Sequence, residues 1–203
     1  MPIARADYEA VAAAIKATEA HTSAQLVCVL ARSSSYYGYI PLTWAALIAL
    51  CVPLPLILLT HWPVQHIYAA QLLTFLALGI VLSLAPVRMR LVPRNIQRSR
   101  AHRAAIEQFA IRGLRHTSER TGVLIFMSVA ERYVRIIADD GVAAKIPNHA
   151  WQAVVERLVI HARDGHYAQG FVDALKQSGD LLAEPFPPRR DAKNELPDRL
   201  YVI

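Results

Sequence analysis

Residues 42–60 read LTWAALIALCVPLPLILLT, and residues 67–85 read IYAAQLLTFLALGIVLSLA. No Lys, Arg, Asp or Glu occurs anywhere between Arg32 and Arg88. Each run approaches the roughly 20 apolar residues that a helix needs to cross a hydrocarbon core of about 30 Å. A buried helix of a globular domain would carry a polar face, and neither run has one. We therefore expect a two-helix transmembrane hairpin, with residues 61–66 as its outer loop.

The composition of the whole chain agrees with a membrane segment. The hydrophobic fraction is 54%, the charged fraction is 19% and the mean hydropathy is +0.26. These values lie above the usual apolar share and below the usual charged share of water-soluble proteins. The rest of the chain suffices for one compact domain. We expect residues 1–35 and 95–203 to form that domain, with a basic juxtamembrane segment at 86–98.

The net charge of +6 has a local origin directly after the second apolar run. Six of the 22 basic residues lie between residues 86 and 103, where no acidic residue occurs, and the other 16 balance the 16 acidic residues. Arginines beside a membrane helix contact anionic lipid headgroups. No aromatic residue is interleaved for base stacking, so we expect no nucleic-acid partner. The expected headgroup contacts are Arg88, Arg90, Arg94 and Arg98, with Arg100 and Arg103 continuing the stripe.

The same charges predict the orientation of the hairpin. The loop at 61–66 has no Lys or Arg, whereas Arg32 precedes the hairpin and the arginine stripe follows it. Positive residues stay on the cytoplasmic side, so both termini should be cytoplasmic. The amino terminus lacks the apolar core of a signal peptide. We expect a multi-pass protein of the cytoplasmic membrane.

Outside the hairpin, the hydrophobic pattern predicts an α/β domain with a mixed sheet. A helix capped by Asp7 precedes a buried strand at Gln25–Ala31. After a helix capped by Ser99, strands at 122–129 and 133–138 are separated by three residues, which predicts an antiparallel hairpin. The strand at Gln25 reaches residue 122 through a long crossover, which predicts parallel pairing. Asn148 caps the next helix, Pro185 ends the last one, and residues 200–203 form an edge strand after an extended tail at 187–197.

Several runs resemble the TPM domain family. They are His102–Phe109, Gly113–Leu114, Thr117, Arg120–Phe126, Glu131–Tyr133 and Ile136–Asp139. The closing residues 186–188 and 194–199 resemble the short bacterial membrane-inserted branch of that family. The resemblance covers most of residues 1–35 and 95–203, and it implies an α/β/α sandwich around a small mixed sheet. It also implies a bacterial inner-membrane location.

The resemblance implies several functions. Family members include thylakoid-lumen proteins linked to photosystem II repair, some with acid phosphatase activity, and members that bind a divalent metal such as calcium. Others are accessory proteins at membranes without known catalysis. This chain departs from the exported members, because its domain is expected in the cytoplasm and its first strand leads into the membrane.

The strongest candidate for chemistry is Asp139-Asp140, two carboxylates at the end of a predicted strand. Adjacent carboxylates supply hard oxygen ligands for Ca²⁺ or Mg²⁺. The competing interpretation is a turn in which an Asp caps a helix, since neighbouring strand residues point to opposite faces. A metal site would need further carboxylates, for which the sequence offers Glu107, Glu119, Asp164 and Asp173.

Three functions remain open on the sequence alone. The first is a membrane-anchored accessory domain that acts through contacts with the lipid bilayer or with an unidentified membrane or cytoplasmic protein. The second is a phosphatase that depends on a divalent metal at Asp139 and Asp140. The third, a small channel or transporter subunit, lacks ionisable residues at membrane depth and would require the hairpin to oligomerise.

Overall fold

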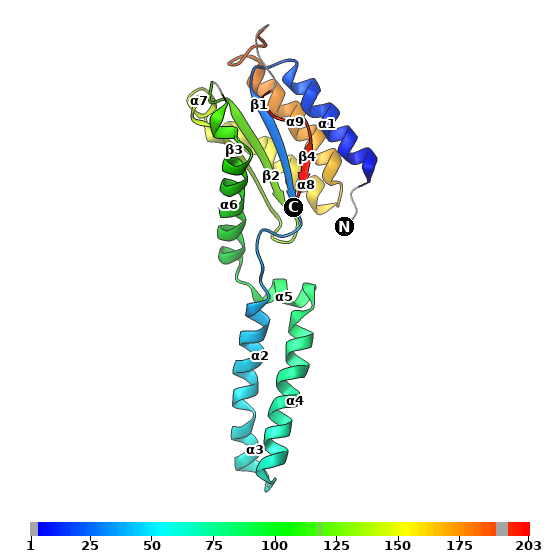
Figure 1. Cartoon of the computed structure of the whole chain (residues 1–203), viewed down its shortest axis with the longest axis vertical. Coiled ribbons are helices and arrows are strands. Elements are labelled where there is room, and N and C mark those ends of the chain that lie inside the picture. The colour runs from blue at the N-terminus through cyan, green and yellow to red at the C-terminus, as the bar shows by residue number, and fades with distance from the viewer. Residues whose placement is uncertain (1–3, 118, 190–194) are drawn as a thin grey trace. The chain divides into compact units, whose positions relative to one another are not determined.

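The computed structural model describes residues 4–117, 119–189 and 195–203. The chain divides into two compact units, which we call the α/β unit (residues 1–34 and 98–203) and the hairpin unit (residues 35–97). Figure 1 shows the elements of both units. Part of the extended tail predicted at 187–197 lies outside the described residues.

The α/β unit is built on a four-stranded mixed sheet in the order β3-β2-β1-β4. Strand β1 pairs in parallel with β2 and with β4, and β2 pairs antiparallel with β3. The predicted parallel crossover, antiparallel hairpin and edge strand are therefore confirmed. The strands are β1 (Gln25–Ala31), β2 (Gly122–Ser128), β3 (Tyr133–Ala138) and β4 (Leu200–Val202).

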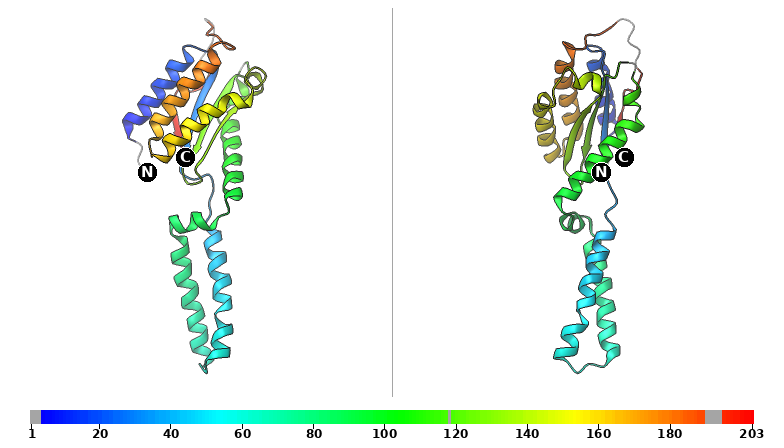
Figure 2. Two further views of the ribbon diagram at one scale, coloured as in Figure 1. Left: turned by 180° about the vertical axis from the view of Figure 1, so that it is seen from behind. Right: turned by 90° about the vertical axis from the view of Figure 1, so that its left-hand side faces the viewer.

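Helices cover both faces of this sheet, as the two views in Figure 2 show. Alternate residues of β1 point to opposite faces: Leu26 and Cys28 belong to one core, while Val27 and Val29 belong to the other. The first core is closed by α1 (Arg5–Glu19), α8 (Gln152–Arg163) and α9 (Tyr167–Ala183), and the second by α6 (Arg94–Ile111). The α/β/α sandwich is confirmed.

The short elements of the α/β unit lie in its connections. They are the 3₁₀ turns η1 (Leu114–His116) and η2 (Asn148–Trp151) and the one-turn helix α7 (Asp140–Ala143). The break between α8 and α9 falls at Gly165, whose positive φ of 79° suits a residue without a side chain. Both cores are therefore closed by helices joined through tight turns.

The apolar runs form the hairpin unit. Helices α2 (Tyr39–Cys51) and α3 (Pro53–Leu59) come from the first run, α4 (Val64–Ser83) comes from the second, and α5 (Ala85–Leu91) follows. The boundary between α2 and α3 lies directly before Pro53, which cannot donate the backbone hydrogen bond of a continuous helix. Residues 39–59 and 64–83 are each long and apolar enough to cross a membrane.

Three predicted helix starts were wrong. The helix expected from Ser99 begins at Arg94, because the carbonyl of Pro93 accepts the first turn's bonds from Ile96 and Gln97. Asp7 is not the cap of α1: it lies in the first turn and accepts from the Ala4 amide at 3.2 Å. Asn148 begins the η2 turn, with Pro147 as its extended cap residue.

Candidate functional site

The two predicted site carboxylates follow β3, at the edge of the sheet where the parallel strands begin. Ala138 pairs with Val123, and the Asp139 amide donates to the Gly122 carbonyl at 2.9 Å. Because β3 runs antiparallel to β2, its end meets the start of β2. Ligands of open α/β sheets bind at the opposite edge, beyond the carboxyl ends of the strands. Asp139 and Asp140 therefore do not occupy the usual ligand-binding edge of this sheet.

Asp139 acts locally as a helix cap. It is 6% exposed, it precedes α7, and its Oδ1 accepts from the Asp140 amide at 2.9 Å. Its Oδ2 is buried without a hydrogen-bond partner among the described residues and lies 4.0 Å from Arg120 Nε. A carboxylate at a helix N-terminus satisfies an unpaired backbone donor and faces the positive end of the helix dipole.

Asp140 points outward and pairs with the same arginine. Its Oδ2 lies 2.9 Å from Arg120 Nη1, and its side chain is 78% exposed. Arg120 itself has a positive φ of 54°. At Gly141, an added Cβ would lie 2.7 Å from the carbonyl oxygens of Glu119 and Arg120, so glycine permits the start of α7 to approach this loop.

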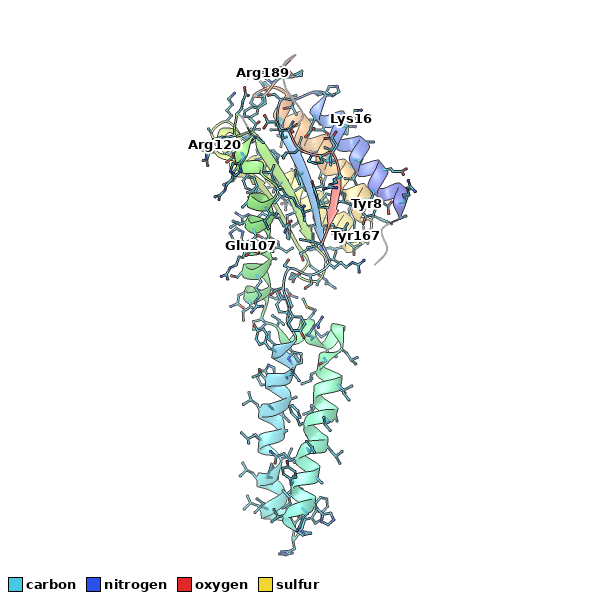
Figure 3. The ribbon with its side chains drawn as sticks, in the orientation of Figure 1. Tyr8, Lys16, Glu107, Arg120, Tyr167 and Arg189 are labelled. Atoms are coloured by element: carbon cyan, nitrogen blue, oxygen red, sulfur yellow. The ribbon has the colours of Figure 1, made fainter. Side chains whose placement is uncertain are left out.

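The other carboxylates that the sequence suggested as metal ligands do not join Asp139 and Asp140. Some form ion pairs with other residues, and Glu107 lies on another helix. Glu119 pairs with Arg189, and Asp173 Oδ2 lies 2.9 Å from His161 Nε2. Figure 3 places Glu107 part-way along α6, away from Arg120. Within the described part of the chain, no three His, Cys, Asp or Glu side chains gather into a metal-binding group. The donor set at Asp139 and Asp140 is thus two carboxylates accompanied by an arginine.

The opposite edge of the sheet, at the carboxyl ends of β1 and β2, holds a buried glutamate. Glu131 is 6% exposed, and its Oε1 accepts from the Ser34 amide at 2.9 Å and from Ser33 Oγ at 3.3 Å. Its Oε2 accepts a hydrogen bond from Ser128 Oγ. The local sequence does not signal this burial, because the groups that Glu131 binds after β1 lie far away in the chain. This glutamate fixes the chain where it leaves β1 for the hairpin unit.

A second, half-buried carboxylate was also not predicted from the sequence. Glu19 ends α1, and its Oε1 accepts from the Leu26 amide at 2.8 Å. Burial and the charge of Asp198 raise the pKa of Glu19 to about 8, although the Leu26 hydrogen bond lowers it. Glu19 and Asp198 lie at opposite ends of the sequence, so no spacing pattern could have paired them.

The predicted headgroup arginines lie on two consecutive helices. Arg88 and Arg90 belong to α5, and Arg94 and Arg98 are one turn apart on α6. Arg90, Arg94 and Arg98 are exposed, whereas Arg88 is half-buried. None of the four forms an ion pair with a described residue, so four positive charges stand uncompensated within this segment.

Comparisons with known proteins agree with this architecture. The family model described as TPM domain matches residues 85–181. Among solved structures, the NMR structure of BA42 protein from the psychrophilic bacterium Bizionia argentinensis is similar, with a TM-score of 0.63 and 17% sequence identity, covering 100% of this chain and 97% of that one. At that identity the likeness shows the fold. No curated protein matches the sequence. Residues 85–181 of this chain belong to the TPM domain family.

Proposed function

We propose that this protein is a TPM-domain accessory protein of the bacterial cytoplasmic membrane, anchored by its hairpin unit and acting through protein or lipid contacts. The observation that carries the proposal is the outward direction of the apolar side chains of the hairpin. Only 11% and 6% of the residues in the two apolar windows are buried. Core helices of a globular protein would hide most of such residues.

The packing between the hairpin helices supports the same proposal. Helix α2 turns the small residues Ala45 and Ala49 inward, and Gly79 of α4 approaches Leu42. In membrane helix pairs, small residues at the contact allow the two backbones to approach closely. Burying apolar side chains between the helices brings no hydrophobic gain there, because lipid is equally apolar. The leucines are left on the outside, where hydrocarbon would surround them.

The polar side chains of the hairpin also suit a lipid environment. The hydroxyls of Thr43, Thr60 and Thr74 each donate to the carbonyl four residues earlier in the chain. These hydroxyls need no partner outside the helix, and in hydrocarbon every unsatisfied polar group costs several kcal/mol. The four uncompensated arginines follow directly, in the place where they would meet anionic headgroups.

A fractionation experiment tests the anchor. We expect the full chain in bacterial membranes to resist extraction by alkaline carbonate and to require detergent. Recovery of the protein in the high-speed supernatant without detergent would overturn the proposal.

Labelling tests the proposed sidedness with both termini in the cytoplasm. A membrane-impermeant maleimide should react in intact cells with His61→Cys, in the outer loop, and should reach Glu156→Cys on α8 only after lysis. Labelling of Glu156→Cys in intact cells would reverse the orientation.

Lipid selectivity tests the arginines. In nanodiscs of mixed phosphatidylcholine and phosphatidylglycerol, the full chain should enrich phosphatidylglycerol around itself. Replacing Arg88, Arg90, Arg94 and Arg98 by Gln should abolish most of the enrichment, since each basic residue near an anionic surface contributes about 1 kcal/mol. The control variant Arg157→Gln/Arg163→Gln, exposed on α8, should behave as the wild type. Equal enrichment in all three proteins would contradict a headgroup role.

A metal-dependent phosphatase is the second candidate function. The observation that favours it is the buried Oδ2 of Asp139 beside Asp140, which accepts no hydrogen bond from any described residue. Calorimetric titration of the purified protein with Ca²⁺ and with Mg²⁺ tests it, together with hydrolysis of a phosphomonoester. Metal-dependent hydrolysis that Asp139→Asn abolishes would favour this function over an accessory role.

A further inference from the structure

The carboxyl-terminal strand is paired over a short length. Strand β4 pairs with β1 only at Cys28, Val29 and Leu30, and two bonds extend the contact: Arg32 N to Ile203 O at 2.8 Å and Ile203 N to Leu30 O at 3.0 Å. In that register, residue 198 would stand opposite Leu26. The Leu26 amide bonds to Glu19 Oε1 instead, at 2.8 Å. A side chain of α1 thus takes the place of the next backbone hydrogen bond between β1 and β4.

The second oxygen of Glu19 requires a proton. Glu19 Oε2 is buried and finds no hydrogen-bond donor among the described residues, and the carboxyl group next to it is that of Asp198. Two ionised carboxylates offer only acceptors and repel each other. When Glu19 is protonated, its hydroxyl donates to Asp198 while Oε1 still accepts from Leu26.

Among the described residues, the other groups near Glu19 are neutral or exposed. From β1, the buried Cys28 thiol is held neutral, because burial and the charge of Glu19 raise its pKa. From α9, the neighbours of α1 at Thr18 are uncharged: Thr18 donates to the Leu175 carbonyl and touches Gly179.

The remaining charged neighbours belong to α1 and to the tail. On α1, Lys16 is exposed one turn earlier, and the His21 ring lies 2.9 Å from the Ala17 carbonyl. From the tail, the Arg199 guanidinium lies over the Tyr201 ring.

We propose that Glu19 and Asp198 form a proton-sharing carboxyl pair that holds β4 on the sheet, and that loss of the shared proton at mildly alkaline pH releases β4. The bond that breaks is the hydrogen bond between the two carboxyl groups, and the proton goes to solvent. What remains is charge repulsion at the base of a three-residue edge strand. Short edge strands open locally at lower free energy than the centre of a sheet.

The sign of the pH dependence follows from proton binding. The pKa of Glu19 rises from its ordinary 4.5 to about 8 in the folded protein, so the folded state holds a proton that the unfolded state gives up. The stabilisation is complete below about pH 4.5 and declines as the pH rises to about 8. Protection of β4 should therefore decrease as the pH rises towards about 8.

Amide hydrogen exchange of the full chain in detergent micelles tests the pair. After correction for the intrinsic exchange rate, protection of the Ile203 amide should fall by up to about tenfold per pH unit as the pH rises towards the pKa of Glu19, and should level off above it. The amide of Ile125, at the centre of the sheet, should keep its protection between pH 6 and pH 9. Constant protection of Ile203 over that range would overturn the proposal.

Substitutions test whether the pH dependence of Ile203 protection comes from Glu19 and Asp198. Glu19→Gln keeps an acceptor for Leu26 and a donor for Asp198, so Ile203 should stay protected at every pH. Asp198→Asn removes one charge and should move the midpoint to lower pH. Glu9→Gln, exposed on the same helix, is the matched control and should follow the wild type. An unchanged slope in Glu19→Gln would contradict the proposal.

A direct titration keeps the proposal testable if Glu19→Gln fails to fold. The carboxyl carbon of Glu19, followed by ¹³C NMR in the wild-type chain, should titrate near pH 8. A midpoint below pH 6 would show that no proton is shared.

Discussion

In α9 of the α/β unit, Phe171, Leu175 and Leu182 are fully buried, whereas in α3 of the hairpin unit Leu58 and Leu59 are 81% and 82% exposed. Apolar residues thus lie inside a core in one unit and on the outside of the helices in the other. In the first unit, apolar side chains leave water by packing on a sheet. In the second, they stay on the outside of the helices, an arrangement that suits the membrane anchor proposed above. The comparison teaches that hydrophobicity alone does not separate a core helix from a helix with an outward-facing apolar surface, while the direction of the side chains does.

The largest expected effect contrasts the same substitution in the two units. Leu175→Ala should lower the free energy of unfolding by about 2–5 kcal/mol, because it leaves a cavity in a closed core. Leu58→Ala should change it by less than about 0.5 kcal/mol, since Leu58 has little to lose. Denaturant unfolding of the full chain in micelles, followed by circular dichroism, measures both. Equal losses would break the comparison.

A charge placed on the outer surface of the hairpin gives a sharper test of the comparison between the two units. Leu76→Arg, on an exposed position of α4, should cost about 2.5–3.5 kcal/mol of membrane insertion, because an arginine must then enter hydrocarbon. The measurement is the fraction of protein that remains in carbonate-washed membranes. Ile106→Arg, on an exposed position of α6 in the α/β unit, is the control and should leave that fraction unchanged. An unaffected Leu76→Arg would argue against lipid contact.

A smaller effect is expected at the carboxyl edge of the sheet. Glu131→Ala should destabilise the α/β unit by about 1–3 kcal/mol, because the half-buried Ser34 loses the acceptor of its amide. Thermal unfolding of the full chain measures this loss. Glu156→Ala, an exposed glutamate of α8, should lie within about 0.5 kcal/mol of the wild type. The two variants would behave alike if Glu131 were a solvated turn residue.

The smallest expected effect separates the two neighbouring aspartates. Asp139→Ala removes the cap of α7 and should cost about 1 kcal/mol. Asp140→Ala removes an exposed ion pair with Arg120 and should cost less than about 0.5 kcal/mol. Denaturant unfolding without added metal measures both changes. A repeat in Ca²⁺ or Mg²⁺ distinguishes a cap from a ligand, because a bound metal would stabilise the wild type above both variants.

Local sequence patterns predicted most of the α/β architecture. Strand β1 was recognised from a short run of apolar residues at Gln25–Ala31, and the β2–β3 hairpin from two runs separated by three residues. These features depend on residues close together in the chain, so their spacing is visible. The start of α6 at Arg94 and the cap of η2 at Pro147 were missed, because the carbonyl and fixed φ of a proline take the place of a capping side chain there.

The sequence by itself determined the two apolar helices, the placement of the arginines and the strands of a mixed sheet, because each follows from the period or charge of one contiguous segment. Only the tertiary structure decided the partners of two inward-facing carboxylates: Glu131 with Ser34, and Glu19 with the Leu26 amide. It also placed Asp139 beside an arginine instead of among further acids. Such pairings depend on how distant segments meet in the fold, and no local periodicity records that meeting.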